Sequence, residues 1–335
     1  MGYQGYSYTG PAVGGVSKDA LAISAGYTMM ANLFPTLSGS LMTQMNERLD
    51  ALPVSADIRA NSLSVGGAIA NNFFNARLTD GAAGAQVPYV PGTNPGDFQP
   101  VNASQPVLPL WGNVTTFAAV NNAQFGNGLP PTLGSAEWIA DYNQVKALGC
   151  STCGTAEQQL IARFWADGGG TFTPPGHWID ITNGAISDTG LSTLEAARLT
   201  ALVGMSVADA GITAWQDKYQ YNIWRPITAI NNCTLATCGV EGEPGWTPFL
   251  STPNFPSYVS GHSSFSGSAA GALSGYFGND NLAFCTPADP ASGVSGERCF
   301  TSFSDAAAEA GISRIYGGIH FEFDNGRAVN NAFNL

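Results

Sequence analysis

The sequence predicts an all-α fold, a multi-helix bundle with long loops rich in Gly and Pro. Apolar residues recur at three- and four-residue spacing in several segments, which is the period of an amphipathic helix. The alternation of apolar and polar residues that marks strands is nearly absent, and clusters of Gly, Pro and Asn separate the helical segments. At 335 residues with 44% hydrophobic content, the chain can bury a sizeable core. Because it shows no internal repeat or clear linker, we expect one domain over residues 1–335, with helices and a long loop to about 133 and the functional helices from about 134.

The N-terminal part predicts helices followed by a long irregular connection. Residues 18–50 carry the Ala, Leu, Met and Ile of helices, punctuated by Pro35, and residues 57–78 predict another helix with Ser55 as its N-cap. From 79 to 133 the sequence changes to Gly, Pro, Asn and aromatic residues. An irregular stretch of that length is uncommon in a compact domain unless it has a function.

The C-terminal part predicts the strongest helix of the chain. It runs from about Ser192 to Arg225, and Pro226 is expected to end or kink it. The loop DGGGTFTPPGHW precedes it along the chain. The other helices that we expect here lie at residues 135–147, 155–165, 260–276 and 304–316.

The composition excludes some partners. Charged residues make up 11% of the chain, against about 25% in typical soluble domains. The net charge of −12 argues against nucleic acid or anionic membrane, since both need a basic face. No apolar run reaches the roughly 18 residues of a membrane span, and the first residues lack the basic and apolar regions of a signal peptide.

Six cysteines fall in three close pairs within polar loops, which predicts short-loop disulfides and hence an extracytoplasmic or secreted protein. The alternative is a zinc site at CSTC, but no second CxxC or HxxxH stands at finger spacing. We favour disulfides, above all for the second and third pairs. The pairs are Cys150 with Cys153, Cys233 with Cys238, and Cys285 with Cys299.

Three short segments, KYQYNIWRP, PSYVSGH and SRIYGGIHFEFD, gather three cations and two imidazoles from a chain with only 12 Lys and Arg and 3 His. Lys218 and Arg225 stand two helical turns apart in the expected helix, so they would share one face about 10 Å apart. Such cations repel each other unless an anion lies between them. The alternative is that Lys218 pairs with Asp217 or extends into solvent.

The second segment predicts a helix N-terminus with Ser260, Gly261 and His262. Free backbone N–H groups there can bind an anion, with His262 beside it to donate or accept a proton. The alternatives are a plain N-cap for Ser260 and a hydrogen-bonded core residue for His262.

The third segment places Arg314 six residues before His320, with two glycines between them. A neutral His320 nitrogen suits a nucleophile toward phosphorus or a ligand to a metal oxyanion. Asp324 either hydrogen-bonds the other ring nitrogen or is a surface acid.

Read as K-x6-R-P, P-S-x-x-S-G-H and S-R-x5-H-x3-D, the three segments resemble the signature shared by vanadium-dependent haloperoxidases and the type 2 phosphatidic acid phosphatase superfamily. The resemblance implies that His320 is the axial vanadium ligand or the phosphatase nucleophile, and that His262 is the acid–base residue. It also implies a set of side chains and backbone groups that bind the oxygens of vanadate, or of phosphate in its absence: Lys218, Arg225, Ser260, Gly261 and Arg314.

Other stretches resemble the haloperoxidase branch. Trp215 and Phe255 stand where aromatic residues line the halide pocket of the fungal chloroperoxidases, and Asp167 stands where an acid pairs with the third-segment arginine, here Arg314. NLFPTLSGS, PYVPGTNPGDFQP and LPLWGNVTTF are similar to bacterial homologues, so the resemblance covers nearly the whole chain. The chain departs from the family at Val259, where a Pro is usual. His177 has no role to carry over and is expected in a loop or a subunit contact.

The resemblance therefore implies a chloroperoxidase-like helical fold and a vanadate-dependent haloperoxidase. Its partners would be hydrogen peroxide, chloride or bromide, and a small organic acceptor. Two alternatives stay open: a soluble phosphatase or phosphotransferase that acts through a phosphohistidine, and a noncatalytic structural or self-assembling homologue. A homo-oligomer is compatible with each.

Overall fold

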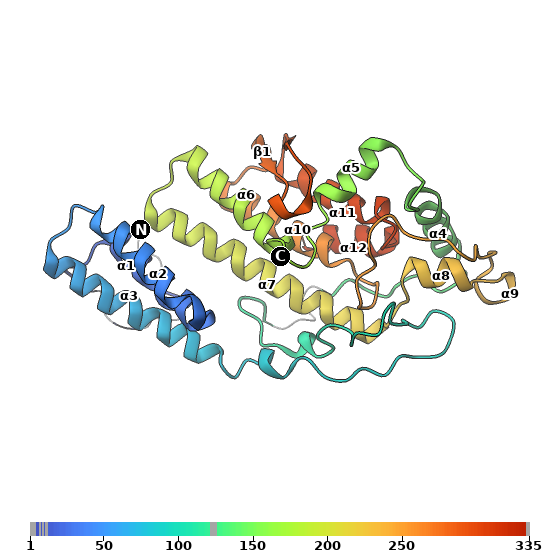
Figure 1. Ribbon diagram of the computed structural model, residues 1–335, viewed down its shortest axis with the longest axis horizontal. Coiled ribbons are helices and arrows are strands. Elements are labelled where there is room, and N and C mark those ends of the chain that lie inside the picture. The colour runs from blue at the N-terminus through green and yellow to red at the C-terminus, as the bar shows by residue number, and fades with distance from the viewer. Residues whose placement is uncertain (1–4, 7, 9, 11–12, 121–125, 333–335) are drawn as a thin grey trace. The chain divides into compact units, whose positions relative to one another are not determined.

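A computed structural model of the chain describes residues 5, 6, 8, 10, 13–120 and 126–332 (Figure 1). Helices dominate these residues, and the strands form one two-stranded hairpin, which confirms the expected all-α class. Contacts between Cα atoms divide the chain into two compact units, each described here by itself. The first is Met1–Ala83 with Leu191–Arg198, and the second is Gly84–Gly190 with Leu199–Leu335. The expectation of one domain stays a prediction.

The first unit is built on three helices and one 3₁₀ turn. The first and third helices pack closely where Gly66 faces Ser24, since a Cβ at Gly66 would lie 2.6 Å from the Leu21 carbonyl oxygen. Ser17 and Ser55 cap these helices by accepting a backbone N–H in the first turn. The elements are α1 (Lys18–Leu33), η1 (Pro35–Leu37), α2 (Ser38–Asp50) and α3 (Ala56–Arg77).

The second unit holds all three signature segments. The long connection expected from 79 to 133 contains only 3₁₀ turns in its described part. The helices are α4 (Ala136–Leu148), α5 (Ala156–Phe164), α6 (Thr173–Thr189), α7 (Thr193–Tyr221), α8 (Pro226–Asn232), α9 (Leu235–Cys238), α10 (Gly261–Phe277), α11 (Phe303–Tyr316) and α12 (Glu322–Ala332). The hairpin is β1 (Phe284–Pro287) with β2 (Glu297–Phe300), and the 3₁₀ turns are η2 (Ala82–Gly84), η3 (Trp111–Asn113) and η5 (Pro290–Ser292). The N-terminal residues of α7, to Arg198, belong to the first unit.

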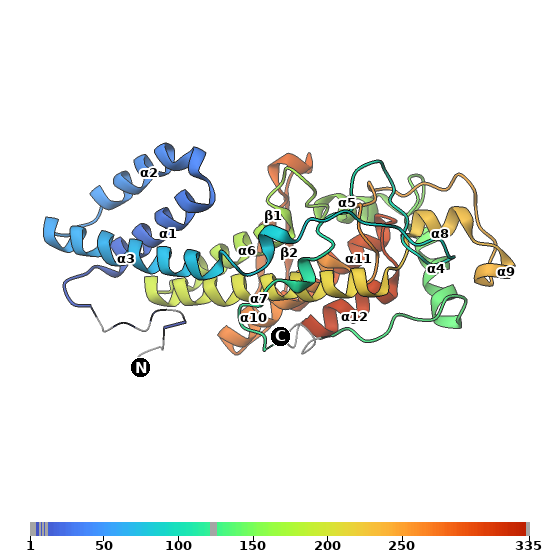
Figure 2. The ribbon, with the colours of Figure 1, turned by 90° about the horizontal axis from the view of Figure 1, so that it is seen from below.

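Within the second unit, helix α10 contacts α6, α11 and α12 (Figure 2). Its sequence GHSSFSGSAAGALSGYF is almost entirely small residues on the buried side, so neighbouring helices can approach closely. This packing brings the start of α10, the last turn of α11 and the segment before α12 to one place. Those are the positions of the second and third signature segments.

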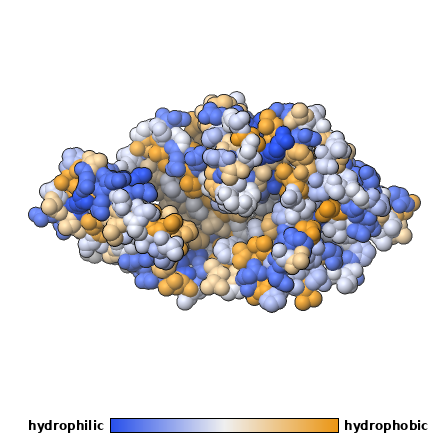
Figure 3. Space-filling view, viewed as in Figure 1, coloured by the Kyte–Doolittle hydropathy of each residue, from blue (hydrophilic) through white to orange (hydrophobic). Residues whose placement is uncertain are grey.

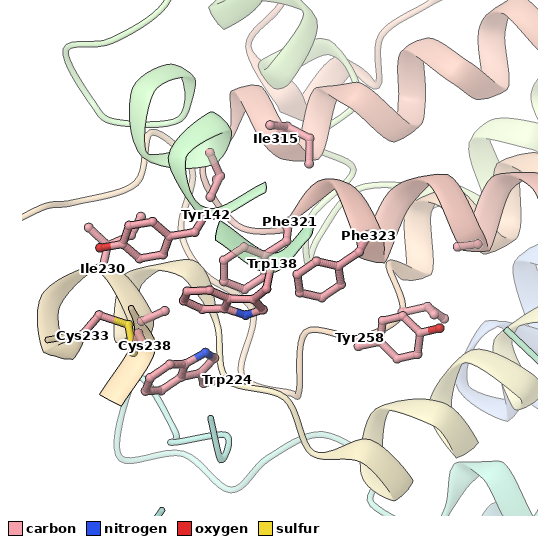
Figure 4. Close-up of a cluster of buried hydrophobic side chains, with 14 of the residues drawn as sticks. Trp138, Tyr142, Trp224, Ile230, Cys233, Cys238, Tyr258, Ile315, Phe321 and Phe323 are labelled. Carbon is pink, nitrogen blue, oxygen red and sulfur yellow. A yellow bond between two sulfur atoms is a disulfide. The ribbon is translucent and has the colours of Figure 1, made fainter. Parts of the chain in front are cut away.

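An aromatic cluster supports the loops that carry these segments (Figure 4). Trp138 stacks on Tyr142 within α4 at 5.2 Å between ring centroids, and Phe321 stacks on Phe323 at 5.0 Å. Tyr258 packs against Phe323 at 6.2 Å. Tyr258 lies within the second signature segment, and Phe321 and Phe323 lie within the third. Burial of these three rings therefore anchors the backbone of both loops.

The prediction for the loop DGGGTFTPPGHW is wrong from residue 173 onward. Helix α6 begins at Thr173, with Pro174 and Pro175 in its first turn. Proline is accommodated there because the first helical N–H groups have no intrahelical partner. His177 is therefore a buried helix residue, and its expected place in a loop or subunit contact is wrong.

The predicted end of the long helix is also wrong. α7 stops at Tyr221, and Asn222 takes a positive φ of 54°. The backbone then pairs with the long connection, where the Phe98 N–H donates to the Asn222 carbonyl at 2.8 Å. Pro226 begins α8, so Arg225 precedes it in extended backbone, the conformation that a following proline favours.

All three predicted disulfides are present, Cys150–Cys153, Cys233–Cys238 and Cys285–Cys299. The zinc alternative at CSTC is wrong, since both of its thiols are bonded to each other. Among the described residues, no helix is both long and apolar enough to cross a bilayer.

Candidate active site

A cavity of about 670 Å³ in the second unit brings residues of the predicted site together. Gly261 and His262 reach it from the start of α10, Arg314 from the end of α11, and His320 from the segment before α12. Trp215, Phe255 and Asp167 also line it. We call this cavity the site pocket. On the side of the second unit that Figure 3 shows, polar and apolar residues alternate in small groups.

Lys218 lies behind the wall of the site pocket and does not line it. Its ammonium donates to the carbonyls of Pro256 and Ser257 at 3.0 Å each, and to that of Val259. The ammonium also stands over the Phe255 ring, 4.9 Å from its centroid. Lys218 therefore holds the turn that leads into α10, and the alternatives of a pair with Asp217 or an exposed lysine are wrong.

Arg225 is also fully buried, and it is not on the helix of Lys218. Its Nε donates to the Phe255 carbonyl at 2.7 Å and its Nη1 to the Ile319 carbonyl at 2.8 Å. Nη1 lies 3.0 Å from Nε2 of His320. Nη2 has no hydrogen-bond partner among the described residues. One face of the guanidinium thus holds two loops together while one nitrogen stays available as a donor.

Arg314 has a similar division of its nitrogens. Nη1 donates to the Trp165 carbonyl at 2.9 Å, and Nε has no partner among the described residues. The expected direct pair with Asp167 is not formed, because Asp167 Oδ2 lies 3.1 Å from Nδ1 of His177 instead. Burial lowers the pKa of Arg314 to about 10, and the negative charge of Asp167 acts in the opposite direction. Asp167 therefore acts on Arg314 through its charge.

His320 is held in one tautomer by Asp324. Nδ1 of His320 lies 2.8 Å from Oδ2 of Asp324, so of the two alternatives for Asp324 the hydrogen bond is present and the surface acid is wrong. The same oxygen accepts from the Ser257 hydroxyl at 2.5 Å and from the Phe321 N–H at 3.0 Å. Burial and the charges of Arg225 and Lys218 lower the pKa of His320 well below its usual value. A neutral ring that donates from Nδ1 carries its lone pair on Nε2.

Asp324 is itself perturbed, because burial raises its pKa to about 6 against the hydrogen bonds from Ser257 and Phe321. Sequence reasoning gave no role to Ser257. Its place in the sequence could have suggested one, because Ser257 is the first Ser of the signature segment PSYVSGH, five residues before His262.

His262 is held less tightly. Its Nε2 lies 3.2 Å from the Ala166 carbonyl, which can only accept, so the hydrogen is on Nε2 and the lone pair on Nδ1. Burial and the charge of Arg314 lower the pKa of His262 well below its usual value. A neutral imidazole that lines the site pocket can take up and return a proton.

Ser260 is the N-cap of α10, as expected. Its hydroxyl oxygen accepts from the backbone N–H of Ser263 and lies 2.8 Å from the Ser263 hydroxyl, which also contacts Oδ1 of Asn325 at 2.9 Å. Gly261 is the first residue of the helix, where backbone N–H groups lack intrahelical acceptors.

These groups fit a tetrahedral oxyanion. Lys218, Arg225 and Arg314 are 0%, 0% and 3% exposed, and burial lowers the pKa of Arg225 to about 9. Buried positive charge is unfavourable without an anion. Nη2 of Arg225 and Nε of Arg314 offer unused N–H donors, and Nε2 of His320 offers a lone pair to a central atom. Use of that lone pair requires Nη1 of Arg225 to turn from Nε2 toward an oxygen of the anion.

His177 is the residue whose place the sequence did not reveal. Its ring is completely buried, stacks on Trp165 at 4.7 Å between centroids, and contacts Asp167 on one nitrogen and Thr286 of β1, at 3.2 Å, on the other. It links the hairpin to the loop that carries Asp167.

Residues 198–333 match the family model for the VCPO second helical-bundle domain. The chain is similar to the vanadium chloroperoxidase of Curvularia inaequalis, with 23% identity over 378 residues, which cover 88% of this chain and 61% of that protein. The crystal structure of a bacterial vanadium-dependent iodoperoxidase superposes with a TM-score of 0.74 and 25% identity, over 96% of this chain and 89% of the other. The chain is thus similar in sequence and in fold to vanadium haloperoxidases.

The fold of the chain is also similar to that of two further solved structures. The apo-type bacterial vanadium-dependent chloroperoxidase gives a TM-score of 0.71 at 17% identity, over 93% of this chain and 80% of that one. The holo-type gives 0.67 at 17% identity, over 94% and 79%. The chain spans 61% of the length of its curated relative.

Proposed function

We propose that the site pocket holds vanadate and that the chain oxidises chloride or bromide with hydrogen peroxide to hypohalous acid. The observation that carries the proposal is the pair of unused guanidinium donors, Nη2 of Arg225 and Nε of Arg314, beside a His320 ring fixed with its lone pair on Nε2. That donor set suits an oxyanion whose central atom accepts a nitrogen ligand.

The oxygens of vanadate would be held by Arg225, Arg314, the Ser260 hydroxyl and the Gly261 N–H, and the central atom by His320. Lys218 adds positive charge from behind the wall and keeps the turn before α10 in shape. Bound vanadate supplies Lewis acidity without a change of oxidation state, so the reaction needs no haem, flavin or nicotinamide.

The proton is moved by His262. Its Nδ1 lone pair can accept a proton from a hydroxyl or peroxide in the site pocket, and the carbonyl of Ala166 keeps the ring oriented through Nε2. The low pKa of His262 keeps the ring ready as a base near neutral pH.

The aromatic wall supports the choice of halide oxidation. The rings of Trp215 and Phe255 lie 5.0 Å apart and line the site pocket, with the Lys218 ammonium behind them. An apolar wall backed by positive charge suits a halide anion and excludes water. On this ground we propose chloride or bromide as substrate.

A phosphatase is the second candidate, because the same donors fit a phosphoryl group and Nε2 of His320 suits a nucleophile. Purified protein would be incubated with orthovanadate, peroxide and bromide while bromination of phenol red is followed. Hydrolysis of p-nitrophenyl phosphate would be measured without vanadate. We expect bromination that His320→Ala abolishes. Robust ester hydrolysis without bromination would favour the phosphatase over the haloperoxidase. Absence of both activities would favour a noncatalytic structural homologue.

The matched control is Thr182→Ala, which removes a buried hydroxyl that donates to the Trp178 carbonyl of its own helix and contacts none of the proposed ligands. It should keep most of the bromination.

We also propose that the chain works in an oxidising compartment outside the cytoplasm. The three disulfides support this, since such bonds persist where thiols are not kept reduced. Mass spectrometry of protein taken from its native host under alkylating conditions should find all six cysteines unmodified by the reagent.

A further inference from the structure

A second cavity, of about 480 Å³, lies beside the site pocket within the second unit. The two cavities share Pro175, Trp215 and Phe265 in their linings. We call the second cavity the side pocket. Its other walls come from α6, from α7 and from the connection that contains η3. A molecule in it would therefore be separated from the site pocket only by aromatic and proline side chains.

Glycines of α7 create the space. A Cβ at Gly204 would meet no atom within 4 Å, so this residue faces open room. A Cβ at Gly211 would lie 2.9 Å from the Phe265 ring, so the glycine lets that ring approach the helix closely. Glycine is unfavourable in helix interiors, so two glycines in one wall of this cavity indicate that the open space has a function.

The side pocket suits a neutral aromatic molecule. No residue in its described lining carries a charge, and the side-chain hydrogen-bond donors there are two indole N–H groups. That of Trp215 donates to the Val107 carbonyl at 3.1 Å. That of Trp111 has no hydrogen bond among the described residues and lies 4.0 Å from the Cβ position of Gly211. Cavities of about 300–1,000 Å³ with apolar walls and one or two polar groups are typical of small-molecule sites.

We propose that the side pocket binds the organic acceptor of the reaction, a neutral phenol of one or two rings. Trp111 donates a hydrogen bond to the hydroxyl oxygen, and the ring faces Trp215 and Phe265 at the boundary with the site pocket. This inference rests on the proposed function, which supplies the hypohalous acid.

The chemical step balances without another reagent. A carbon of the electron-rich ring attacks the halogen of hypohalous acid and forms a carbon–halogen bond. The oxygen–halogen bond breaks with its electron pair on oxygen, and the proton lost from the ring carbon joins that oxygen to give water. Binding next to the site pocket lets the acceptor react before the hypohalous acid diffuses away.

The first test measures binding alone, by titrating 2-naphthol into vanadate-free full-length protein in a calorimeter. Gly204→Leu places a side chain in the open space of the side pocket. Gly184→Leu is the matched control, since Gly184 is also a helix glycine with no atom within 4 Å of its Cβ position, and it lines neither cavity.

We expect binding to weaken at least tenfold in Gly204→Leu and to stay unchanged in Gly184→Leu. Equal binding in all three proteins, loss in both variants, or no binding by the parent protein would overturn the proposal. If Gly204→Leu has a strongly lowered melting temperature, Ala208→Leu is tested in its place, because Ala208 also lines the side pocket.

Trp111→Phe tests the hydrogen bond. It should weaken 2-naphthol several-fold and leave naphthalene unchanged, and an equal loss for both ligands would remove Trp111 from the account.

The second test separates this proposal from the proposed function. Triiodide formation from iodide and peroxide, which needs no organic acceptor, should be the same in Gly204→Leu as in the parent. If the parent oxidises no halide but binds 2-naphthol, the function fails and the side pocket stands as a binding site.

If halide oxidation occurs, 2-naphthol and 2-naphthol-6,8-disulfonate would compete for bromine. The ratio of brominated 2-naphthol to brominated disulfonate is compared with the ratio that reagent hypobromous acid gives. The parent protein should give a higher ratio than the reagent, and Gly204→Leu should give the same ratio as the reagent. A parent ratio equal to the reagent ratio would mean that the acceptor reacts in solution, against the proposal.

Discussion

The two imidazoles of the site pocket are held in different ways. His320 is fixed by Asp324, which itself accepts from Ser257 and a backbone N–H, so the ring is locked by a network of its own. His262 has only backbone carbonyls as partners among the described residues, that of Ala166 at 3.2 Å and that of Trp165. A ligand to a central atom needs a fixed tautomer, whereas a proton carrier needs a ring that can gain and lose its proton. We propose that this difference in support underlies two roles, with His320 as the ligand and His262 as the proton carrier.

The largest effect should follow replacement of His262, which would sharpen this comparison. His262→Ala is expected to lower the bromination turnover by about 10²–10⁴-fold, the usual contribution of a general acid–base residue. Vanadate affinity should change little, because the ring is not a proposed ligand. Turnover and calorimetric affinity measured on the same variant check this. Loss of affinity without loss of turnover would exchange the roles.

Asp324→Asn should give the next largest effect, on binding. The amide keeps the shape of the side chain but removes the negative charge that holds Nδ1–H of His320. Loss of such a supporting partner costs about 10–100-fold in metal affinity. Calorimetric titration with orthovanadate measures it. Unchanged affinity would show that the lock on His320 does not matter for the anion.

Ser257→Ala removes one donor to Asp324 and leaves the hydrogen bond of His320 in place. A typical hydrogen bond contributes about 0.5–1.5 kcal/mol net, so vanadate affinity should fall by a few-fold at most. If Ser257→Ala is as harmful as Asp324→Asn, the hydroxyl acts on the anion directly and the network has been assigned wrongly.

The smallest effect concerns pH. Because the folded pKa of His262 lies below its unfolded value of about 6.5, the unfolded chain binds more protons as pH falls through that value. Stability is thus full above about pH 6.5 and is lost below it. Asp324 has a folded pKa raised from its ordinary value of 3.8 to about 6. Its effect on stability is therefore the opposite one, because the folded chain binds more protons between these two pH values.

Thermal unfolding of the vanadate-free protein between about pH 7 and 5 should fall less steeply in His262→Gln than in the parent. Parallel curves would mean that His262 is not buried as a neutral ring.

The sequence predicts the site better than it predicts the backbone that holds it. Spacing within each segment identifies Ser260, His320 and Asp324, because an N-cap and a contact between residues four apart are local. Arg225 was misplaced, since the end of α7 depends on pairing with Gly96 and Phe98, more than 100 residues earlier.

Helix α6 was missed for a related reason. Two adjacent prolines favour a loop in sequence, and only packing against α10 shows that they open a helix. The three carbonyls that hold Lys218 and the contact of His177 with Thr286 likewise come from segments distant in sequence, which no local pattern encodes.

Calorimetric titration of the vanadate-free chain with orthovanadate, in the parent and in His320→Ala, tests the central claim most directly. We predict one vanadate per chain in the parent, displaced by phosphate, and binding at least tenfold weaker in His320→Ala. Absence of binding by the parent, or equal binding by both proteins, would contradict a vanadate site built around His320.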